Sequence, residues 1–247
     1  MIGWIAEHQS LLIGLVMMAV IGPAVGNYVC SVVYRLPRGQ TPFERHPYCG
    51  HCGADLQPRD LFPILSWLST RGRCRYCRGR IPGIYTLIEI ACGVVFIAYY
   101  HFYYVTEYFL MAACYAVFVI TLAGIQWREG WISATIYSYA MLATGMFVIS
   151  AYGTIFDWLT PAFVMLVVCL LLQRMHAGIT GSDARPFHSP WIWWMVLMAA
   201  WVPIHQWSLL AIPVALLLIF RFACRQAGSW VLFPIAAFAL CLPPLMF

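Results

Sequence analysis

The sequence predicts an all-helical protein that crosses a membrane about eight times and carries one small metal-binding loop. Three observations support this fold class: the composition, the placement of the arginines and a cluster of paired cysteines. Hydrophobic residues make up 63% and charged residues 9% of the 247 residues, and the mean hydropathy is +0.79. Soluble domains contain roughly 25% charged residues, so the composition excludes an ordinary soluble domain.

The membrane spans follow from apolar runs long enough to cross a hydrocarbon core, which takes roughly 20 helical residues. We therefore divide the chain into a first span (1–34), a cytoplasmic loop (35–82) and a seven-span membrane domain (83–247). The first run has no basic residue before it and continues to Arg35, so we expect it to be retained as a span and not cleaved as a signal. The predicted spans are 9–34, 83–105, 107–126, 131–150, 157–174, 189–204, 207–222 and 228–247.

The arginines predict the orientation, because Arg and Lys in short loops stay on the cytoplasmic side. The chain has no lysine, and its arginines lie at positions 35, 38, 45, 59, 71, 73, 75, 78, 80, 128, 174, 185, 221 and 225. With eight spans and both termini on the outer side, every arginine falls on the cytoplasmic side. Topology and contact with lipid headgroups account for this positive charge, so we expect membrane lipid and no nucleic acid as a partner.

Four of the ten cysteines form two CxxC pairs in the cytoplasmic loop, Cys49 with Cys52 and Cys74 with Cys77. This spacing is typical of a structural zinc ribbon, in which each pair offers two thiolates from one tight turn. An iron–sulfur site or two redox-active disulfides are the alternatives, although a reducing cytoplasm argues against structural disulfides. The loop is too short to build a core, so we expect the metal to supply folding free energy.

Three of the nine acidic residues, Glu89, Glu129 and Asp183, lie in or beside spans on the inner side, and Glu89 and Asp183 stand out among them. Glu89 falls about two turns into the second span, where it is either a buried partner for an arginine or backbone amide, or a residue with a direct role. Asp183 lies in "GITGSDARPF", whose glycines allow close approach of the backbone. Two carboxylates held together can share a proton and act as acid and base on an amide, so a partner for Asp183 would indicate a hydrolase.

In order, "GNYVCSVVYRLP" (26–37), the two CxxC pairs around "RDLFPILSWLSTRGRCRYC" (59–77) and "GIYTLIE" (83–89) resemble the N-terminal half of bacterial prepilin peptidases. The resemblance implies an eight-span inner-membrane aspartyl endopeptidase that removes the basic leader of type IV prepilins or pseudopilins. It also implies N-methylation of the new N-terminus from S-adenosylmethionine. In that family two aspartates are catalytic, and Asp183 occupies the position of the second.

The chain departs from this family at the first catalytic aspartate, where Gln126 stands in "GIQWREGWISAT". An amide does not titrate, so Gln126 cannot serve as a general base. Glu129 lies one helical turn further on and is the candidate for the missing carboxylate, while its alternative role is that of an interfacial acid beside Arg128. Cys30 also replaces an asparagine that is usual in the family's first span.

Three functions remain open from the sequence. The first is an active leader peptidase that uses Asp183 and Glu129. The second is an inactive relative that binds prepilin as an assembly factor or acts only as a methyltransferase. The third is an unrelated membrane transporter or scaffold. For leader recognition we expect the few acids on the loop side, Asp55, Asp60 and Glu89, since a basic leader fits an arginine-rich loop poorly.

Overall fold

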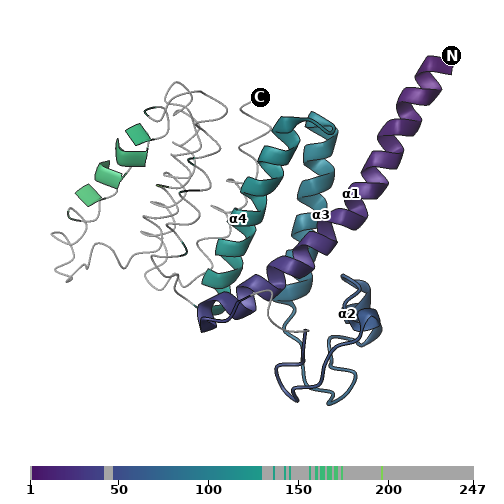
Figure 1. The fold of residues 1–247 in the computed structure, drawn as a ribbon, viewed down its shortest axis with the longest axis vertical. Coiled ribbons are helices and arrows are strands. Elements are labelled where there is room, and N and C mark those ends of the chain that lie inside the picture. The colour runs from purple at the N-terminus through teal and green to yellow at the C-terminus, as the bar shows by residue number, and fades with distance from the viewer. Residues whose placement is uncertain are drawn as a thin grey trace, which may run out of the picture. The chain divides into compact units, whose positions relative to one another are not determined.

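The computed structural model describes residues 2–41 and 47–129, together with isolated positions between 136 and 196. Three helices in this part of the chain are long and apolar enough to cross a membrane. They confirm the first three predicted spans, whereas the spans predicted from residue 131 onward and Asp183 lie outside the described residues. In chain order (Figure 1) the elements are α1 (Ile2–Arg35), η1 (Leu36–Arg38), η2 (Pro58–Asp60), α2 (Leu65–Ser69), α3 (Ile84–Tyr103) and α4 (Glu107–Glu129).

Helices α1 and α3 touch at their backbones through three glycines. A Cβ atom placed on Gly22 would lie 2.7 Å from the Cα of Gly93, and one on Gly26 would lie 2.7 Å from the Cα of Glu89. The ring of Pro23 packs against Gly93 on the same seam. Small residues let membrane helices approach this closely because packing, and not the hydrophobic effect, holds helices together in lipid.

Helix α4 adds aromatic and aliphatic contacts to this pair. The ring of Phe109 meets the rings of Phe96 and Tyr100 edge to face, with centroids 6.0 and 6.4 Å apart. Near the other end of α4, Gly124 lies against the side chains of Val33 on α1 and Ile88 on α3. The three helices therefore share one core, and the largest fully buried side chains are Tyr99, Leu122, Ile125, Val29 and Val33.

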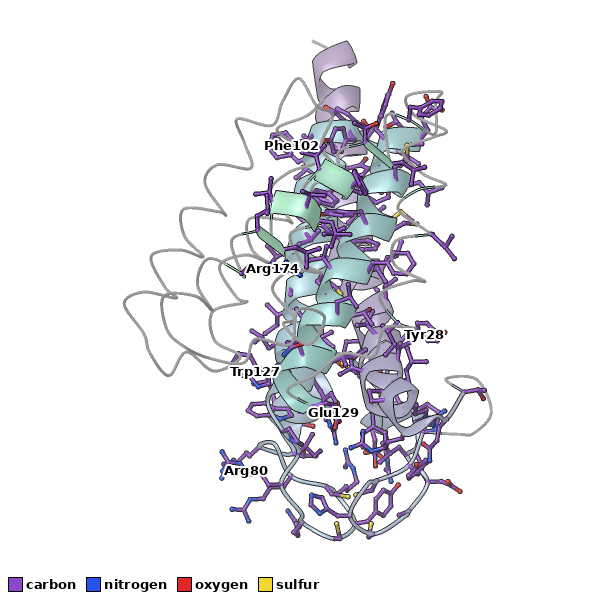
Figure 2. All side chains as sticks on the ribbon, turned by 90° about the vertical axis from the view of Figure 1, so that its left-hand side faces the viewer. Tyr28, Arg80, Phe102, Trp127, Glu129 and Arg174 are labelled. Carbon is purple, nitrogen blue, oxygen red and sulfur yellow. The ribbon has the colours of Figure 1, made fainter. Side chains whose placement is uncertain are left out.

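The cysteine-bearing loop lies at one end of these helices, between α1 and α3. Figure 2 shows Arg80 at this end and Phe102 at the other. Arg35 ends α1, Arg38 ends η1 directly after it, and Arg128 lies one residue before the end of α4. The chain divides into two compact units, Met1–Arg128 and Glu129–Phe247. The first unit contains both CxxC pairs and the whole of α1 and α3.

Candidate metal centre and adjoining pocket

The two CxxC pairs form two similar turns, which we call the knuckles (residues 48–55 and 73–80). An antiparallel bridge closes each knuckle, Tyr48 with Asp55 and Arg73 with Arg80. In the first knuckle, the N–H of Cys49 donates to the carbonyl of Ala54 at 2.9 Å. In the second, the N–H of Cys74 donates to the carbonyl of Gly79 at 2.8 Å. The short bridges point both sulfurs of each pair to one side.

A single residue after each pair turns the backbone into the left-handed region. Gly53 has a φ of 72° and Arg78, at the matching place in the second knuckle, has a φ of 60°. Glycine adopts this conformation without cost, whereas arginine does so with some strain. Gly79 is required for a different reason, since a side chain there would meet the imidazole of His51 and the sulfur of Cys77.

The knuckles bring all four thiols together, and their sulfurs lie within 4.8 Å of one another. Each of these cysteines is a free thiol. Zinc bound by sulfur at about 2.3 Å in a tetrahedron places its ligands about 3.8 Å apart. The distance from Cys49 Sγ to Cys77 Sγ is 3.9 Å, which fits this geometry. The cluster can therefore hold a metal ion, as the spacing predicted, and His51 lies beside it without belonging to it.

The thiols differ in how easily they ionise. Burial raises the pKa of Cys49, but the N–H groups of Cys52 and His51 and the thiols of Cys74 and Cys52 outweigh it, and the pKa falls to about 7. The N–H of Gly79 lowers the pKa of Cys77, yet burial and the three other sulfurs raise it to about 11. A cation at the centre would remove the repulsion that keeps the last thiol protonated, so metal binding and proton release are coupled here.

An ion pair ties the second knuckle to the segment before α2. Arg75 Nε lies 2.7 Å from Asp60 Oδ1, and the hydroxyl of Tyr76 donates to Asp60 Oδ2 at 3.2 Å. The N–H of Gln57 also donates to this carboxylate. Burial raises the pKa of Asp60, but these donors outweigh it and hold the pKa below its ordinary value of 3.8.

The segment between the knuckles is fastened to both flanking helices. The side-chain amide of Asn27 on α1 donates to the carbonyl of Leu61 at 2.6 Å. Glu89 on α3 accepts the N–H of Ile64 at 2.7 Å. The sequence left two roles open for Glu89. The structure shows the first of them, in which Glu89 is the partner of a backbone amide.

Ile64 adopts a conformation that β-branched residues avoid, with φ 61° and ψ −50°. The N–H of Leu65 donates to the carbonyl of Pro63 across it, which makes the turn a γ-turn with positive φ. Such turns are rare and strained, and they persist where the surroundings hold them. Here the carboxylate of Glu89 holds the turn.

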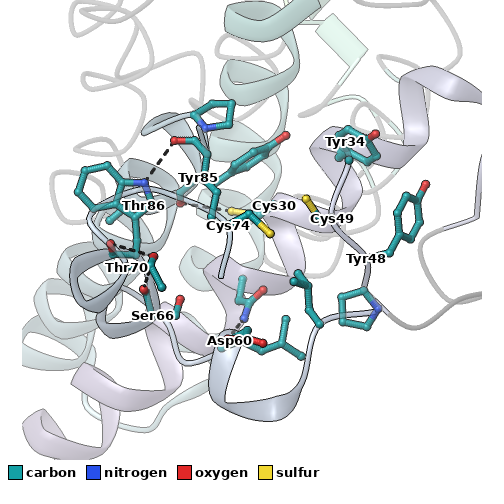
Figure 3. A pocket seen from close by; sticks show the side chains of 18 of the residues that line it. Cys30, Tyr34, Tyr48, Cys49, Asp60, Ser66, Thr70, Cys74, Tyr85 and Thr86 are labelled. Atoms are coloured by element: carbon teal, nitrogen blue, oxygen red, sulfur yellow. Dashed lines mark hydrogen bonds between the residues drawn. The ribbon is translucent and has the colours of Figure 1, made fainter. Parts of the chain in front are cut away.

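A cavity of about 310 Å³ lies where α1, the knuckles and the start of α3 meet (Figure 3). Its walls include Asn27 and Cys30 of α1, Cys49 and Cys74 of the knuckles, and Glu89 of α3. Cys30 donates its thiol to the carbonyl of Tyr85 at 3.3 Å, so this residue joins α1 to α3.

Tyrosines and arginines line one side of this cavity. The guanidinium of Arg128 lies 4.6 Å from the ring centroid of Tyr34 and 5.5 Å from that of Tyr85, so it joins α4 to both other helices. Arg38 stacks on Tyr34 at 4.5 Å. Cation–π contacts of this kind strengthen where water is excluded. Sequence reasoning missed these tyrosines, because no spacing rule links residues 34, 85 and 128.

The structure describes two of the three residues on which proteolysis would depend. Gln126 lies in α4 and is 3% exposed. Glu129 is the last residue of α4 and half-buried, so the helix does extend as far as the role of a second carboxylate requires. Asp183 lies outside the described residues, and its proximity to Glu129 stays a prediction.

Comparison with known proteins gives a result for the N-terminal region that is consistent with this geometry. Residues 20–103 match the family model described as the bacterial Peptidase A24 N-terminal domain. This region is therefore similar to the N-terminal domain of the bacterial A24 peptidases. It contains the family-like motifs, both knuckles, Asn27 and Glu89, and it ends before Gln126.

Relatives in several bacteria carry the family's name. The prepilin leader peptidase/N-methyltransferase of Myxococcus xanthus is 36% identical over 83 residues, which cover 34% of this chain and 25% of the relative. The prepilin leader peptidase/N-methyltransferase of Stutzerimonas stutzeri is 29% identical over 99 residues, which cover 31% of this chain and 34% of the relative. The type 4 prepilin-like proteins leader peptide-processing enzyme of Escherichia coli is 29% identical over 100 residues, which cover 33% of this chain and 37% of the relative.

The match to the prepilin peptidases therefore spans between 25% and 37% of these three relatives' own length. No solved structure matches the chain. The family resemblance thus rests on the part of the molecule that holds the cysteine cluster and its cavity.

Proposed function

We propose that the protein is an inner-membrane aspartyl endopeptidase of prepilin peptidase type, which removes the basic leader of a type IV prepilin or pseudopilin. The observation that carries this proposal is the family match over residues 20–103, which contains a cysteine cluster of zinc geometry and the cavity beside it. The same match argues against an unrelated transporter or scaffold. N-methylation with S-adenosylmethionine enters the proposal through the family resemblance alone.

The proposed chemistry needs two carboxylates that share one proton. In this proposal Asp183 and Glu129 flank the scissile amide, and the ionised one takes a proton from water as the water oxygen attacks the carbonyl carbon. The protonated one gives its proton to the amide nitrogen, which leaves as the new N-terminus. The position of Glu129 at the end of α4, on the side of the arginines, supports this role.

The four cysteines hold a structural zinc in this proposal and take no part in cleavage. A site with four thiolates is closed, so it has no open position for water or substrate. The described acids also limit how a basic leader is bound. Asp60 and Glu89 are engaged by Arg75 and the N–H of Ile64, whereas the side chain of Asp55 is exposed, which favours Asp55 for the leader.

A second candidate is an inactive relative that binds prepilin as an assembly factor or acts only as a methyltransferase. The observation that favours it is Gln126, which is buried at the position where the family has a catalytic aspartate. A buried amide there keeps the shape of the site but supplies neither an acid nor a base.

Co-expression with the prepilin encoded nearest to the gene, followed by intact-mass measurement of the product, separates the two candidates. We expect the unaltered chain to release the leader, and Asp183→Asn and Glu129→Gln each to abolish release. Glu107→Gln is the matched control, because it changes an acid at the opposite end of the same helix. If only Gln126→Asp releases the leader, the inactive relative is the correct function.

A further inference from the structure

Three large apolar side chains project from the loop between the knuckles. Phe62, Leu65 and Leu68 are 60%, 65% and 57% exposed; Leu65 and Leu68 lie one turn apart on α2, and Phe62 lies just before the γ-turn that leads into it. We call them the apolar face. Three large apolar side chains exposed close together in sequence mark a surface that another phase or molecule covers.

The backbone behind the apolar face is fixed at a known height along the membrane helices. Leu61 is bonded to Asn27, which lies eight residues before the end of α1 at Arg35, and Ile64 to Glu89, five residues after the start of α3 at Ile84. At about 1.5 Å per residue, these contacts lie roughly 12 and 8 Å inside the ends of the two helices. With the ends of these helices at the outer edge of the headgroup layer, the two contacts lie where headgroups meet acyl chains, and not in bulk water.

The surroundings of the apolar face favour lipid as its occupant. On α3, Leu87 and Ile90 lie on either side of Glu89 in the sequence and are themselves exposed, so apolar surface continues from the helix toward the loop. Exposed Arg59 and Arg71 bracket the segment, in positions that suit anionic phospholipid headgroups. The same two arginines would repel a basic leader peptide.

We propose that residues 62–68 form an interfacial membrane anchor, with Phe62, Leu65 and Leu68 inserted among the acyl chains of the leaflet on the knuckle side. The strained turn at Ile64, held by Glu89, attaches this anchor to α3. The anchor would set the height of the knuckles above the bilayer, whichever reaction the protein carries out. It does not depend on the proposed function.

The unaltered chain provides the first test. The protein is placed in nanodiscs of phosphatidylethanolamine and phosphatidylglycerol that contain a phospholipid with a photoreactive diazirine near the start of its acyl chain. Trypsin then cuts after Arg45, Arg59 and Arg71, which separates residues 60–71, with the apolar face, from residues 46–59, with the first knuckle. Burial of one Leu or Phe side chain favours the apolar phase by a factor of about ten or more. We therefore expect at least about ten times as many lipid adducts on residues 60–71 as on residues 46–59.

A second test places the photoreactive group in the protein. Benzoylphenylalanine replaces Phe62, Leu65 or Leu68, and the matched control replaces Tyr76, an exposed aromatic residue of the second knuckle. Only chains that retain their metal are compared, so each is known to have a folded loop. Lipid adducts at the three positions and few at position 76 support the anchor. Equal yields at all four positions, or cross-links to a polypeptide in place of lipid, overturn it.

Discussion

Glu89 is an acid inside a membrane-length helix, and a backbone amide from outside that helix satisfies it. A carboxylate in this setting is expensive unless it has a partner, so its presence in "IYTLIE" indicated some specific contact. The contact supports the loop, since Glu89 binds the N–H of Ile64, a residue whose backbone is strained. In the structure, this acid of α3 therefore serves as the acceptor that fastens the loop to the helix.

We predict that Glu89→Leu loosens the γ-turn while Glu89→Gln largely preserves it. Leucine leaves the N–H of Ile64 without an acceptor, which costs about 1–3 kcal/mol, whereas glutamine keeps a carbonyl oxygen in place. Hydrogen exchange of residues 61–68, followed by mass spectrometry, should then accelerate by about fivefold to 150-fold in Glu89→Leu. Equal protection in Glu89→Leu and the unaltered chain would show that the bond does not hold the turn.

Residue type predicted some of the special backbone positions and missed others. Gly39, Gly53 and Gly72 all have positive φ, as glycines near turns are expected to. Ile64 and Arg78 share that conformation, although their side chains disfavour it. Tertiary contacts impose it, through Glu89 on Ile64 and through the knuckle geometry on Arg78. No local rule contains such contacts.

At the scale of elements, the second knuckle depends on its ion pair as well as on metal. The side chain of Asp60 is only 8% exposed, while that of Arg75 is 41% exposed, so solvent screens the pair in part. Three donors nevertheless bind the carboxylate of Asp60, and charge-assisted hydrogen bonds of this kind stabilise a fold more than an isolated surface ion pair does.

We predict that the purified chain contains one zinc per molecule and that Asp60→Asn releases it about fivefold faster to a chelator, which corresponds to roughly 1 kcal/mol. Asp55→Asn changes an exposed acid of the same loop and should release zinc at the unaltered rate. Iron in place of zinc, or equal rates for both variants, would contradict this account.

The pH dependence of this effect follows from the lowered pKa of Asp60. A carboxyl whose pKa is lower in the folded state stabilises it above the ordinary pKa, and that contribution is lost only as the pH falls through the lowered value. The ratio of zinc release rates between Asp60→Asn and the unaltered chain should therefore stay constant from about pH 7 to pH 5, where acids with an ordinary pKa remain ionised. A ratio that shrinks within this range would mean that another group carries the effect.

The elements themselves were predictable to different degrees. Run lengths of apolar residues predicted α1, α3 and α4, and CxxC spacing predicted the cysteine cluster, because each depends on neighbours in sequence. The cavity depends on Tyr34, Tyr85 and Arg128, which come from three helices. Only the packed structure brings them together, so periodicity alone could not reveal that site.

For the whole molecule, the distribution of charge connects the fold to the membrane. The arginines of α1, the knuckles and α4 lie at one end of the three described helices, and Val105 lies at the other. The predicted orientation, with the knuckles in the cytoplasm, follows from this asymmetry.

We predict that a membrane-impermeant maleimide does not modify Cys52 or Cys77 in intact spheroplasts, although both are exposed. Opening the membrane in the presence of a zinc chelator should make both reactive. Val105→Cys is the matched reporter for the opposite side and should react from outside without any treatment. Modification of the knuckle cysteines in intact spheroplasts would reverse the orientation.

The glycine seam between α1 and α3 also affects how tightly the loop binds its metal. Because the two helices meet at their backbones, the 48 residues between Arg35 and Ile84 form a loop whose ends are already closed. Closing a free chain of that length costs about 3 kcal/mol, or roughly a hundredfold in an equilibrium constant. The membrane helices thus raise the effective concentration of one knuckle near the other, and the same segment cut from the chain would bind zinc about a hundredfold more weakly.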